Sequence, residues 1–366
     1  MPVILSPRAR RNISRIIPFG LIWLLSGWVF LFIDVSATGF RNLSPETNVT
    51  VTPGVLAFAS LAVLLIGLLV GAVELIWLEN LFRRKALWQK VLSKFLLYTT
   101  LMLLILAAVY PLAAMIELDA SFSDPRVWEK WARFFWSTAF LSTVVQIAVS
   151  LFLSLLYAVI SEHIGHSTLL HLITGRYHSP REEQRIFLFL DMKSSTTLAE
   201  KLGHVRYFHL LRDYYADLSA AIVRHGGEVY QYIGDEVVIT WPLARGVAGA
   251  RCLLCFFAMR ADLYKRRAYY EKYYGFLPDF KAGMHAGEVT TGEIGALKKE
   301  IFFTGDVLNT AARIQGLCNE YGATFLVSGD LMEQVLLPER LSAKALGAVS
   351  LRGRAKEVQV FAVEKG

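Results

Sequence analysis

Four long apolar runs in the first half of the chain constrain its fold more than any other feature. They cover residues 16–33, 55–78, 95–116 and 134–160. A helix needs about 20 mostly apolar residues to cross the hydrocarbon core of a bilayer. One such run alone is compatible with a buried core helix, but four in succession predict a membrane-spanning bundle. The composition agrees, because 54% of the 366 residues are hydrophobic.

Basic residues flank these runs unevenly. They gather before the first run and between the second and third runs: Arg8, Arg10, Arg11, Arg15, Arg83, Arg84, Lys85, Lys90 and Lys94. The other two connections are mixed or acidic. Because cytoplasmic loops carry an excess of Lys and Arg, we expect a multi-pass protein of the cell (inner) membrane with both termini and the soluble domain in the cytoplasm. Much of the net charge of +7 lies beside the apolar runs, where it sets membrane topology.

The composition changes along the chain and predicts three parts. Residues 1–160 form a membrane anchor with four transmembrane helices, in contact with the lipid membrane. Residues 161–184 form a helical linker, and residues 185–366 have the composition of an ordinary globular domain. The last apolar run exceeds one span, so we expect its helix to continue out of the membrane.

The linker has a helical pattern. Ile164, Thr168 and Leu172 share one face of a helix, and such a stripe would let two chains pair as a coiled coil. Its histidines lack the H-x-x-x-H spacing that places two metal ligands on one helical face. We interpret them as solvated or interface residues: His163, His166, His171 and His178.

Glu74 lies inside the second apolar run. An ionisable residue within a membrane span is a candidate for function, such as sensing. Glu74 is near the end of its span, however, and a side chain there is also able to reach the interface.

A hairpin is predicted in the soluble half. Residues 229–233 and 236–241 are rich in β-branched and aromatic residues, and Gly234 and Asp235 lie between them. Glycine at the first turn position supplies the positive φ of a short hairpin. A second carboxylate, Asp191, ends the nearly continuous apolar strand 185–191. Two carboxylates from neighbouring strands are candidates for a metal site.

Small polar residues follow Asp191, where a helix is expected to start. Thr197 and Glu200 have the spacing of a capping box, and we expect the helix to run towards Gly226. Backbone N–H groups at a helix start bind phosphate oxygens well. The candidate phosphate-binding residues are Lys193, Ser194, Ser195 and Thr196. A plain capping loop explains the same pattern equally well.

Asn309 and Arg313 lie four residues apart in a predicted helix that begins at Asp306. They therefore share one face. An amide and a guanidinium that point together are able to orient a sugar and hold a phosphate. The alternative is an ordinary surface pair.

Two other patterns in the soluble half indicate structural roles and not catalytic or binding roles. Cys252 and Cys255 form a C-x-x-C in an apolar helical run without a second ligand pair, so we interpret them as small buried residues. The basic and aromatic stretch 265–274 matches no nucleic-acid-binding motif and is interpreted as a solvated helix face. We therefore expect no nucleic-acid partner.

Four ordered motifs carry a resemblance to a known family. They are F-L-D-M-K-S-S-T, Y-I-G-D-E, H-A-G-E-V-T-T-G-E-I-G and T-G-D-V-L-N-T-A-A-R. The segment from Arg185 to Val363 resembles the catalytic domain of class III nucleotidyl cyclases, which make cyclic AMP or cyclic GMP. The resemblance implies an α+β domain with a ferredoxin-like βαββαβ core. It also implies a homodimer with active sites at the interface. The four-span region is similar to membrane anchors of some bacterial members.

The resemblance assigns a metal site. Asp191 and Asp235 match the two metal-binding aspartates of the family, and the backbone carbonyl of Met192 assists them. The implied cofactors are two Mg²⁺ (or Mn²⁺) ions.

The resemblance also assigns residues that contact the nucleotide. Asn309 matches the residue that orients the ribose, and Arg313 matches the arginine that stabilises charge in the transition state. In the family, both come from the other chain of the dimer. Arg352 matches a basic residue that holds the terminal phosphates.

Two base-binding positions depart from the family patterns. Gln231 stands where adenylate-specific members carry lysine, and Phe302 stands where they carry aspartate or threonine. Guanylate-specific members carry glutamate and cysteine at these positions, so neither pair matches. Glutamine donates and accepts hydrogen bonds and is able to pair with either purine.

The function implied by the resemblance is adenylate cyclase activity, with ATP converted into 3′,5′-cyclic AMP and pyrophosphate. ATP is favoured over GTP by the frequency of adenylate cyclases in the family. A guanylate or dual-specificity cyclase is the alternative enzyme. A degenerate cyclase-like domain that serves as a receptor or interaction module is the non-enzyme alternative. A diguanylate cyclase is disfavoured by Ile233 and Val237, which replace a glycine and a phenylalanine of that family.

Overall fold

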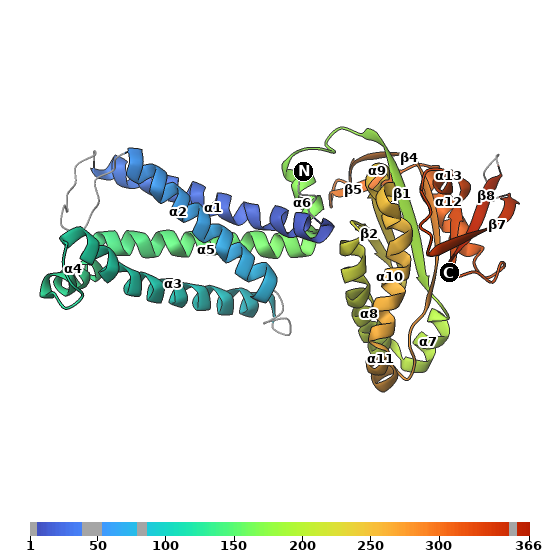
Figure 1. The fold of residues 1–366 in the computed structure, drawn as a ribbon, viewed down its shortest axis with the longest axis horizontal. Helices are drawn as coiled ribbons and strands as arrows, with labels where there is room; N and C mark the ends of the chain where they lie inside the picture. The colour runs from blue at the N-terminus through green and yellow to red at the C-terminus, as the bar shows by residue number, and fades with distance from the viewer. Residues whose placement is uncertain (1–5, 39–52, 79–85, 351–356) are drawn as a thin grey trace. The chain divides into compact units, whose positions relative to one another are not determined.

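The structure is a computed structural model that describes residues 6–38, 53–78, 86–350 and 357–366 (Figure 1). The chain divides into two compact units. One is built from Arg10–Leu170, and the other is centred on His171–Gly366. Each unit is described separately.

Four helices of the first unit are long and apolar enough to cross a membrane, in the described part of the chain. They are α1 (Pro7–Thr38), α2 (Pro53–Val73) with its π-helical extension η1 (Glu74–Leu78), α3 (Leu87–Leu118) and α5 (Thr138–Ile164). The four predicted spans are therefore confirmed. Their outer surfaces expose apolar side chains such as Phe32 and Phe58, as expected for helices that face lipid.

Small residues bring α1 and α2 close together. Gly67 and Gly71 lie one turn apart on α2, and a Cβ atom at Gly67 would lie 2.8 Å from the backbone oxygen of Phe19. Larger residues at these positions would push the helices apart, as in other small-xxx-small packings. On the α5 side, the Trp23 indole donates to the Ser154 hydroxyl at 3.1 Å.

Glu74 is buried inside this unit. Its carboxylate accepts a hydrogen bond from Lys94 on α3, and the Tyr98 hydroxyl donates to its Oε2 atom at 3.0 Å. One turn before Lys94, Lys90 binds Glu162 of α5 at 2.7 Å. The charge of Glu74 is thus balanced by a partner within the bundle.

A short helix, α4 (Pro125–Phe135), precedes α5 and differs from the sequence prediction. The sequence predicts one continuous helical run over residues 134–160, but the chain turns at Trp136. Ser137 then caps α5, because its hydroxyl accepts a hydrogen bond from the Phe140 N–H at 3.2 Å. Trp131 of α4 donates its indole N–H to the carbonyl of Ala107 in α3 at 3.0 Å.

The expected continuous helix between the last span and the linker is wrong. α5 ends at Ile164, and α6 (His166–Ile173) begins after Gly165, whose φ is +91°. Helical residues need a negative φ, and only glycine adopts this conformation easily. The apolar stripe that included Ile164 and Leu172 is therefore divided between two helices.

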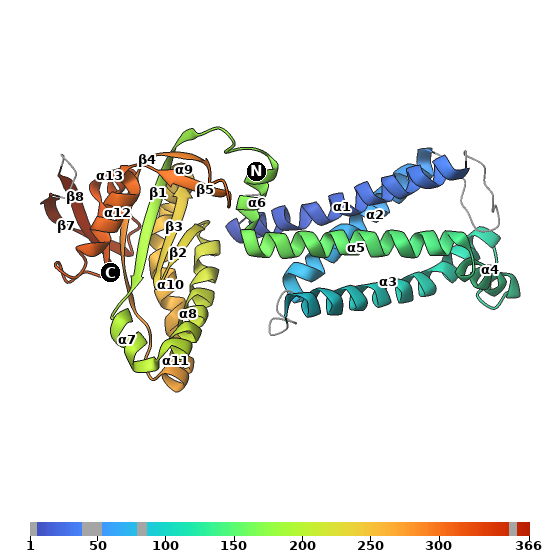
Figure 2. The ribbon, with the colours of Figure 1, turned by 180° about the vertical axis from the view of Figure 1, so that it is seen from behind.

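The second unit contains a mixed sheet with helices on its faces. Its first four strands are β1 (Arg181–Met192), β2 (Glu228–Ile233), β3 (Glu236–Pro242) and β4 (Phe280–Ile294). They lie in the order β2-β3-β1-β4, and all adjacent pairs are antiparallel. The chain crosses between them through α8 (His204–Arg224) and α10 (Arg251–Lys265), which cover one face (Figures 1 and 2). This is the predicted βαββαβ arrangement.

Further elements extend this core. Beyond β4 the sheet continues through β6 (Phe325–Ser328), β8 (Val358–Lys365) and β7 (Leu341–Val349), and β5 (Glu300–Thr304) pairs with the far part of β4. The remaining helices are α7 (Ser195–Leu202), α9 (Leu243–Val247), η2 (Ala248–Ala250), α11 (Arg267–Tyr274), α12 (Asp306–Gly316) and α13 (Gly329–Met332).

Strand β1 is buried on both faces, which explains its nearly continuous apolar sequence. Ile186, Leu188 and Leu190 belong to the core under α8 and α10. Phe187 and Phe189 point to the opposite face, where they belong to the core cluster that includes residues of α12. The core under α8 and α10 also buries Cys252 and Cys255 completely, as predicted.

Candidate active site

The two candidate metal-binding carboxylates lie at the same end of neighbouring strands. Asp191 is near the end of β1 and pairs with Glu236, the first residue of β3. Asp235 occupies the turn between β2 and β3, after Gly234 with φ of +64°. The predicted hairpin is thus confirmed, and the register brings Asp235 beside Asp191.

The electrostatics of this pair favour a bound cation. Burial and the neighbouring Asp235 carboxylate raise the pKa of Asp191, although Lys281, 3.6 Å away, partly opposes the shift. Burial and both aspartates also raise the pKa of Glu236. The Oδ2 atom of Asp235 is buried and has no hydrogen-bond partner among the described residues. Three close, partly buried carboxylates and one unpaired oxygen therefore form a site that a cation would stabilise.

The donor set suits Mg²⁺ or Mn²⁺. No group of three or more His, Cys, Asp or Glu side chains able to hold a metal occurs in the described ranges. Mg²⁺ is commonly bound by only one or two carboxylates together with substrate phosphates and water. Two aspartates with an unpaired buried oxygen fit that pattern.

The segment after Asp191 differs in part from expectation. The side chain of Met192 is buried. The Lys193 N–H donates to the carbonyl of Asp279 at 2.9 Å, and its ammonium binds the Asp279 carboxylate at 2.7 Å. Its backbone N–H therefore already has a partner in this structure, and the phosphate-binding role of Lys193 stays a prediction.

Helix α7 begins at Ser195 with Ser194 as its N-cap, three residues before Thr197, the N-cap that the capping-box spacing predicted. Ser194 precedes it in the left-handed conformation, with φ of +56°, and makes no side-chain cap. Such a backbone is uncommon for a non-glycine residue and often marks functional sites. The helix ends at Gly203, with φ of +73°, so the single expected helix is divided into α7 and α8.

Helix α12 lies directly against β4 because Gly283 has no side chain. A Cβ atom there would lie 2.1 Å from the backbone nitrogen of Gln315. This close approach lets the buried Gln315 amide donate to the Oδ2 atom of Asp191 at 3.2 Å. Sequence reasoning missed Gln315. The available signal was its position on the same helix, two residues beyond Arg313, where the quoted motif ends.

Asn309 and Arg313 both lie on α12, one turn apart. Asn309 is exposed and forms no hydrogen bond with either aspartate among the described residues. The Nη1 atom of Arg313 is buried and without a hydrogen-bond partner in that same part of the chain. One chain therefore assembles the carboxylates and Gln315, but it does not bring Asn309 to them.

The two candidate base-binding residues lie on separate strands. Gln231 is exposed on β2, which forms one edge of the sheet, directly after an irregularity in the pairing with β3 between Val229 and Gln231. Phe302 is 44% exposed on β5, where it pairs with Gly292. Arg352 lies outside the described residues.

Comparisons with known proteins decide the family. A family model for the adenylate and guanylate cyclase catalytic domain matches residues 178–365. This chain belongs to that family.

Several individual relatives are named adenylate cyclases. The chain is 36% identical over 207 residues to adenylate cyclase 2 of Rhizobium meliloti (strain 1021), covering 57% of each chain. It is 25% identical over 181 residues to an adenylate cyclase of Anabaena cylindrica, covering 48% of this chain and 36% of the relative. The chain thus spans little more than half of the first relative and about a third of the second.

A solved structure supports the cyclase fold. A bacterial light-regulated adenylyl cyclase aligns with a TM-score of 0.51 at 20% identity, covering 62% of this chain and 64% of that structure. The predicted fold class and the predicted resemblance are therefore confirmed.

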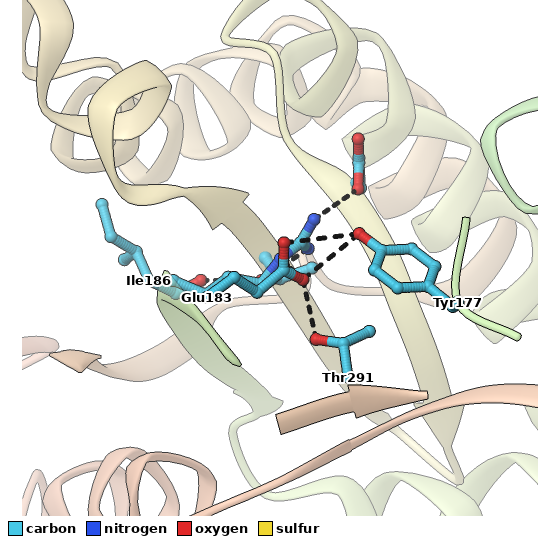
Figure 3. Close-up of polar contacts among 7 residues, drawn as sticks. Tyr177, Glu183, Ile186 and Thr291 are labelled. Carbon is cyan, nitrogen blue, oxygen red and sulfur yellow. Dashed lines mark hydrogen bonds and ion pairs between the residues drawn. The ribbon is translucent and has the colours of Figure 1, made fainter. Parts of the chain in front are cut away.

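The cyclase domain contains a second polar cluster, at the opposite end of β1 from Asp191. The Glu183 carboxylate accepts hydrogen bonds from Thr291 Oγ1 at 2.7 Å, Arg185 Nε at 3.0 Å and the Tyr177 hydroxyl at 3.2 Å (Figure 3). Arg185 is buried, and its guanidinium lies over the ring of Phe303 at 4.7 Å. This cluster fixes the segment before β1 to the sheet, and the sequence motifs gave no sign of it.

Proposed function

We propose that the chain is a membrane-anchored, homodimeric adenylate cyclase that converts ATP into 3′,5′-cyclic AMP and pyrophosphate. The observation that carries this proposal is the pair Asp191 and Asp235, with its unpaired buried oxygen and the raised pKa of Asp191. Two close, partly buried carboxylates with an unpaired oxygen suit divalent cations that also bind a polyphosphate. The names of the relatives support ATP as the substrate.

Asp191, Asp235 and the backbone carbonyl of Met192 would hold two Mg²⁺ or Mn²⁺ ions. When bound, such ions lower the pKa of the attacking hydroxyl and neutralise triphosphate charge. The Gln315 amide positions Asp191 by occupying one of its oxygens, since it donates to Oδ2. The free backbone N–H groups at the first turn of α7, at Ser195 and Thr196, are suited to bind phosphate oxygens.

The reaction forms a bond between the 3′-oxygen of the ribose and the α-phosphorus. The bond to the bridging oxygen breaks, pyrophosphate leaves with its electron pair, and the hydroxyl proton is released. Negative charge grows on the transferring phosphoryl group, and a guanidinium stabilises such charge. We assign this role to Arg313 and assign orientation of the ribose to Asn309.

Asn309 and Arg313 would act in the site of the partner chain. Asn309 is exposed and Arg313 has a buried nitrogen without a partner, which supports a surface completed by a second copy. Each homodimer would then contain two composite sites. In this proposal the four spans anchor the dimer, and both termini and the catalytic domain are cytoplasmic.

Guanylate or dual-specificity activity is the second candidate, because Gln231 and Phe302 match neither family pattern. The deciding experiment supplies the purified full-length protein with Mn²⁺ or Mg²⁺ and an equimolar mixture of ATP and GTP. We expect cyclic AMP and pyrophosphate in equal amounts. Cyclic GMP as the main product would reverse the substrate assignment. Binding of nucleotide without any cyclic product would indicate a receptor or interaction module instead.

A further inference from the structure

A cavity of about 490 Å³, partly open to the surface, lies in the membrane unit. Its wall is formed by the C-terminal half of α1 and the N-terminal halves of α2 and α5, three helices that run side by side (Figures 1 and 2). The volume falls within the roughly 300–1,000 Å³ typical of pockets that enclose small molecules. The proposed cyclase site lies in the other unit and has no part in this cavity.

The wall combines apolar side chains with polar groups from all three helices. On one side, the Trp28 indole donates to the Ser60 hydroxyl at 3.0 Å and joins α1 to α2. From α5, Gln146 contributes a carboxamide that forms no hydrogen bond with any described residue. An amide without a partner is costly in a low-dielectric membrane interior. A ligand with a hydrogen-bonding group would remove that cost.

Gly27 keeps the Gln146 amide accessible. A Cβ atom at position 27 would lie 3.4 Å from Gln146 Nε2 and 3.4 Å from a methyl group of Val63. A Cβ alone would be tolerated, but a longer side chain would occupy the space between α1, α2 and α5. The cavity therefore depends on glycine at this position.

The charges of the wall restrict the head group of a ligand. No Lys or Arg lines the cavity in the described part of the chain, and its one ionisable residue is Asp34. An anionic head group, such as a fatty-acid carboxylate, would find no compensating charge. A neutral carbonyl or hydroxyl group would instead pair with the Gln146 amide, which both donates and accepts.

We propose that this cavity binds a neutral, lipid-soluble molecule whose single polar head, a hydroxyl or carbonyl group, hydrogen-bonds to Gln146. The apolar remainder of the molecule packs between α1 and α2. The site is independent of the proposed catalytic function, and its test measures binding alone.

The experiment uses the full-length protein in lipid nanodiscs and three photoreactive probes of equal chain length: a fatty alcohol, the corresponding alkane and the corresponding fatty acid. Crosslinked peptides are mapped by mass spectrometry, and unlabelled alcohol serves as competitor. We expect the alcohol to label peptides that line the cavity. The alkane should label them about five- to tenfold less, the factor that corresponds to one hydrogen bond.

Substitutions in the cavity wall test whether the labelling occurs inside the cavity. Gly27→Leu should abolish labelling of the cavity, and Gln146→Leu should reduce alcohol labelling to the level of the alkane. Gly54→Leu is the matched control, because a Cβ atom at Gly54 meets nothing within 4 Å and the residue does not line the cavity. It should label like the wild type. If Gly27→Leu proves unstable on thermal unfolding, Gln146→Leu alone carries the test.

Two outcomes would overturn the proposal. Equal labelling by alcohol and alkane in the wild type would show only general exposure to lipid. Stronger labelling by the fatty acid would show that the head-group class is wrong.

Discussion

The Nε2 atom of Gln315 lies 3.2 Å from the Oδ2 atom of Asp191, so helix α12 restrains the carboxylate near the end of β1. The contact exists because Gly283 lets the helix backbone approach β4. One helix thereby supports its own chain's candidate metal site and carries the two residues proposed to act in the partner's site.

Replacement of this amide tests its role as a positioning residue. Gln315→Leu removes the donor and keeps similar volume, and we expect metal affinity to fall by about 10- to 100-fold, as for other groups that orient metal ligands. The measurement is the Mn²⁺ concentration that gives half-maximal activity. High Mn²⁺ should restore most of the maximal rate. Gln334→Leu, on an exposed residue, is the control and should leave the Mn²⁺ requirement unchanged.

Mixed dimers test the composite site. Asp191→Ala removes a proposed metal ligand, and Arg313→Ala removes the proposed transition-state contact, so each variant alone should be nearly inactive. Random pairing of equal amounts gives half heterodimers, each with one intact site of two, and activity should return to about a quarter of wild type. Heterodimers that form, as shown by affinity tags, but remain inactive would exclude sites shared between chains.

Gln231 is the proposed contact to the base. Gln231→Lys installs the residue of adenylate-specific relatives and should raise the ratio of ATP to GTP turnover by about five- to tenfold, the effect of one hydrogen bond. The ratio is measured from kcat/KM for each nucleotide. Gln334→Lys adds the same charge elsewhere and should not change it. If both variants behave alike, Gln231 does not contact the base.

Glu183 should contribute to stability rather than to chemistry. Glu183→Gln keeps the shape but removes the charge that faces the buried Arg185. Loss of one partner of a buried ion pair costs about 3–5 kcal/mol, with a smaller cost expected here because Glu228 remains 3.5 Å from the guanidinium. Thermal unfolding of the full chain in detergent measures the loss. Glu182→Gln, at an exposed neighbouring position, should unfold like the wild type.

The sequence predicts elements whose signals are local. Run length identifies the four spans, and the β-branched residues around Gly234 identify the hairpin. Breaks at Gly165 and Gly203 are not predictable in this way, because a glycine is compatible with a continuing helix and only the structure reveals its positive φ. The contacts of Gln315 with Asp191 and of Lys193 with Asp279 join segments that are distant in the sequence. Residue spacing therefore does not predict them.

Pro111 has a consequence for the order in which the membrane unit is completed. Proline has no N–H, so within α3 it leaves the carbonyl of Ala107, four residues earlier, without its usual helical donor. The indole of Trp131 supplies that donor from α4. Trp131 is synthesised twenty residues after Pro111. Until the chain has been made as far as Trp131, the carbonyl of Ala107 lacks the indole donor that it has in the folded unit.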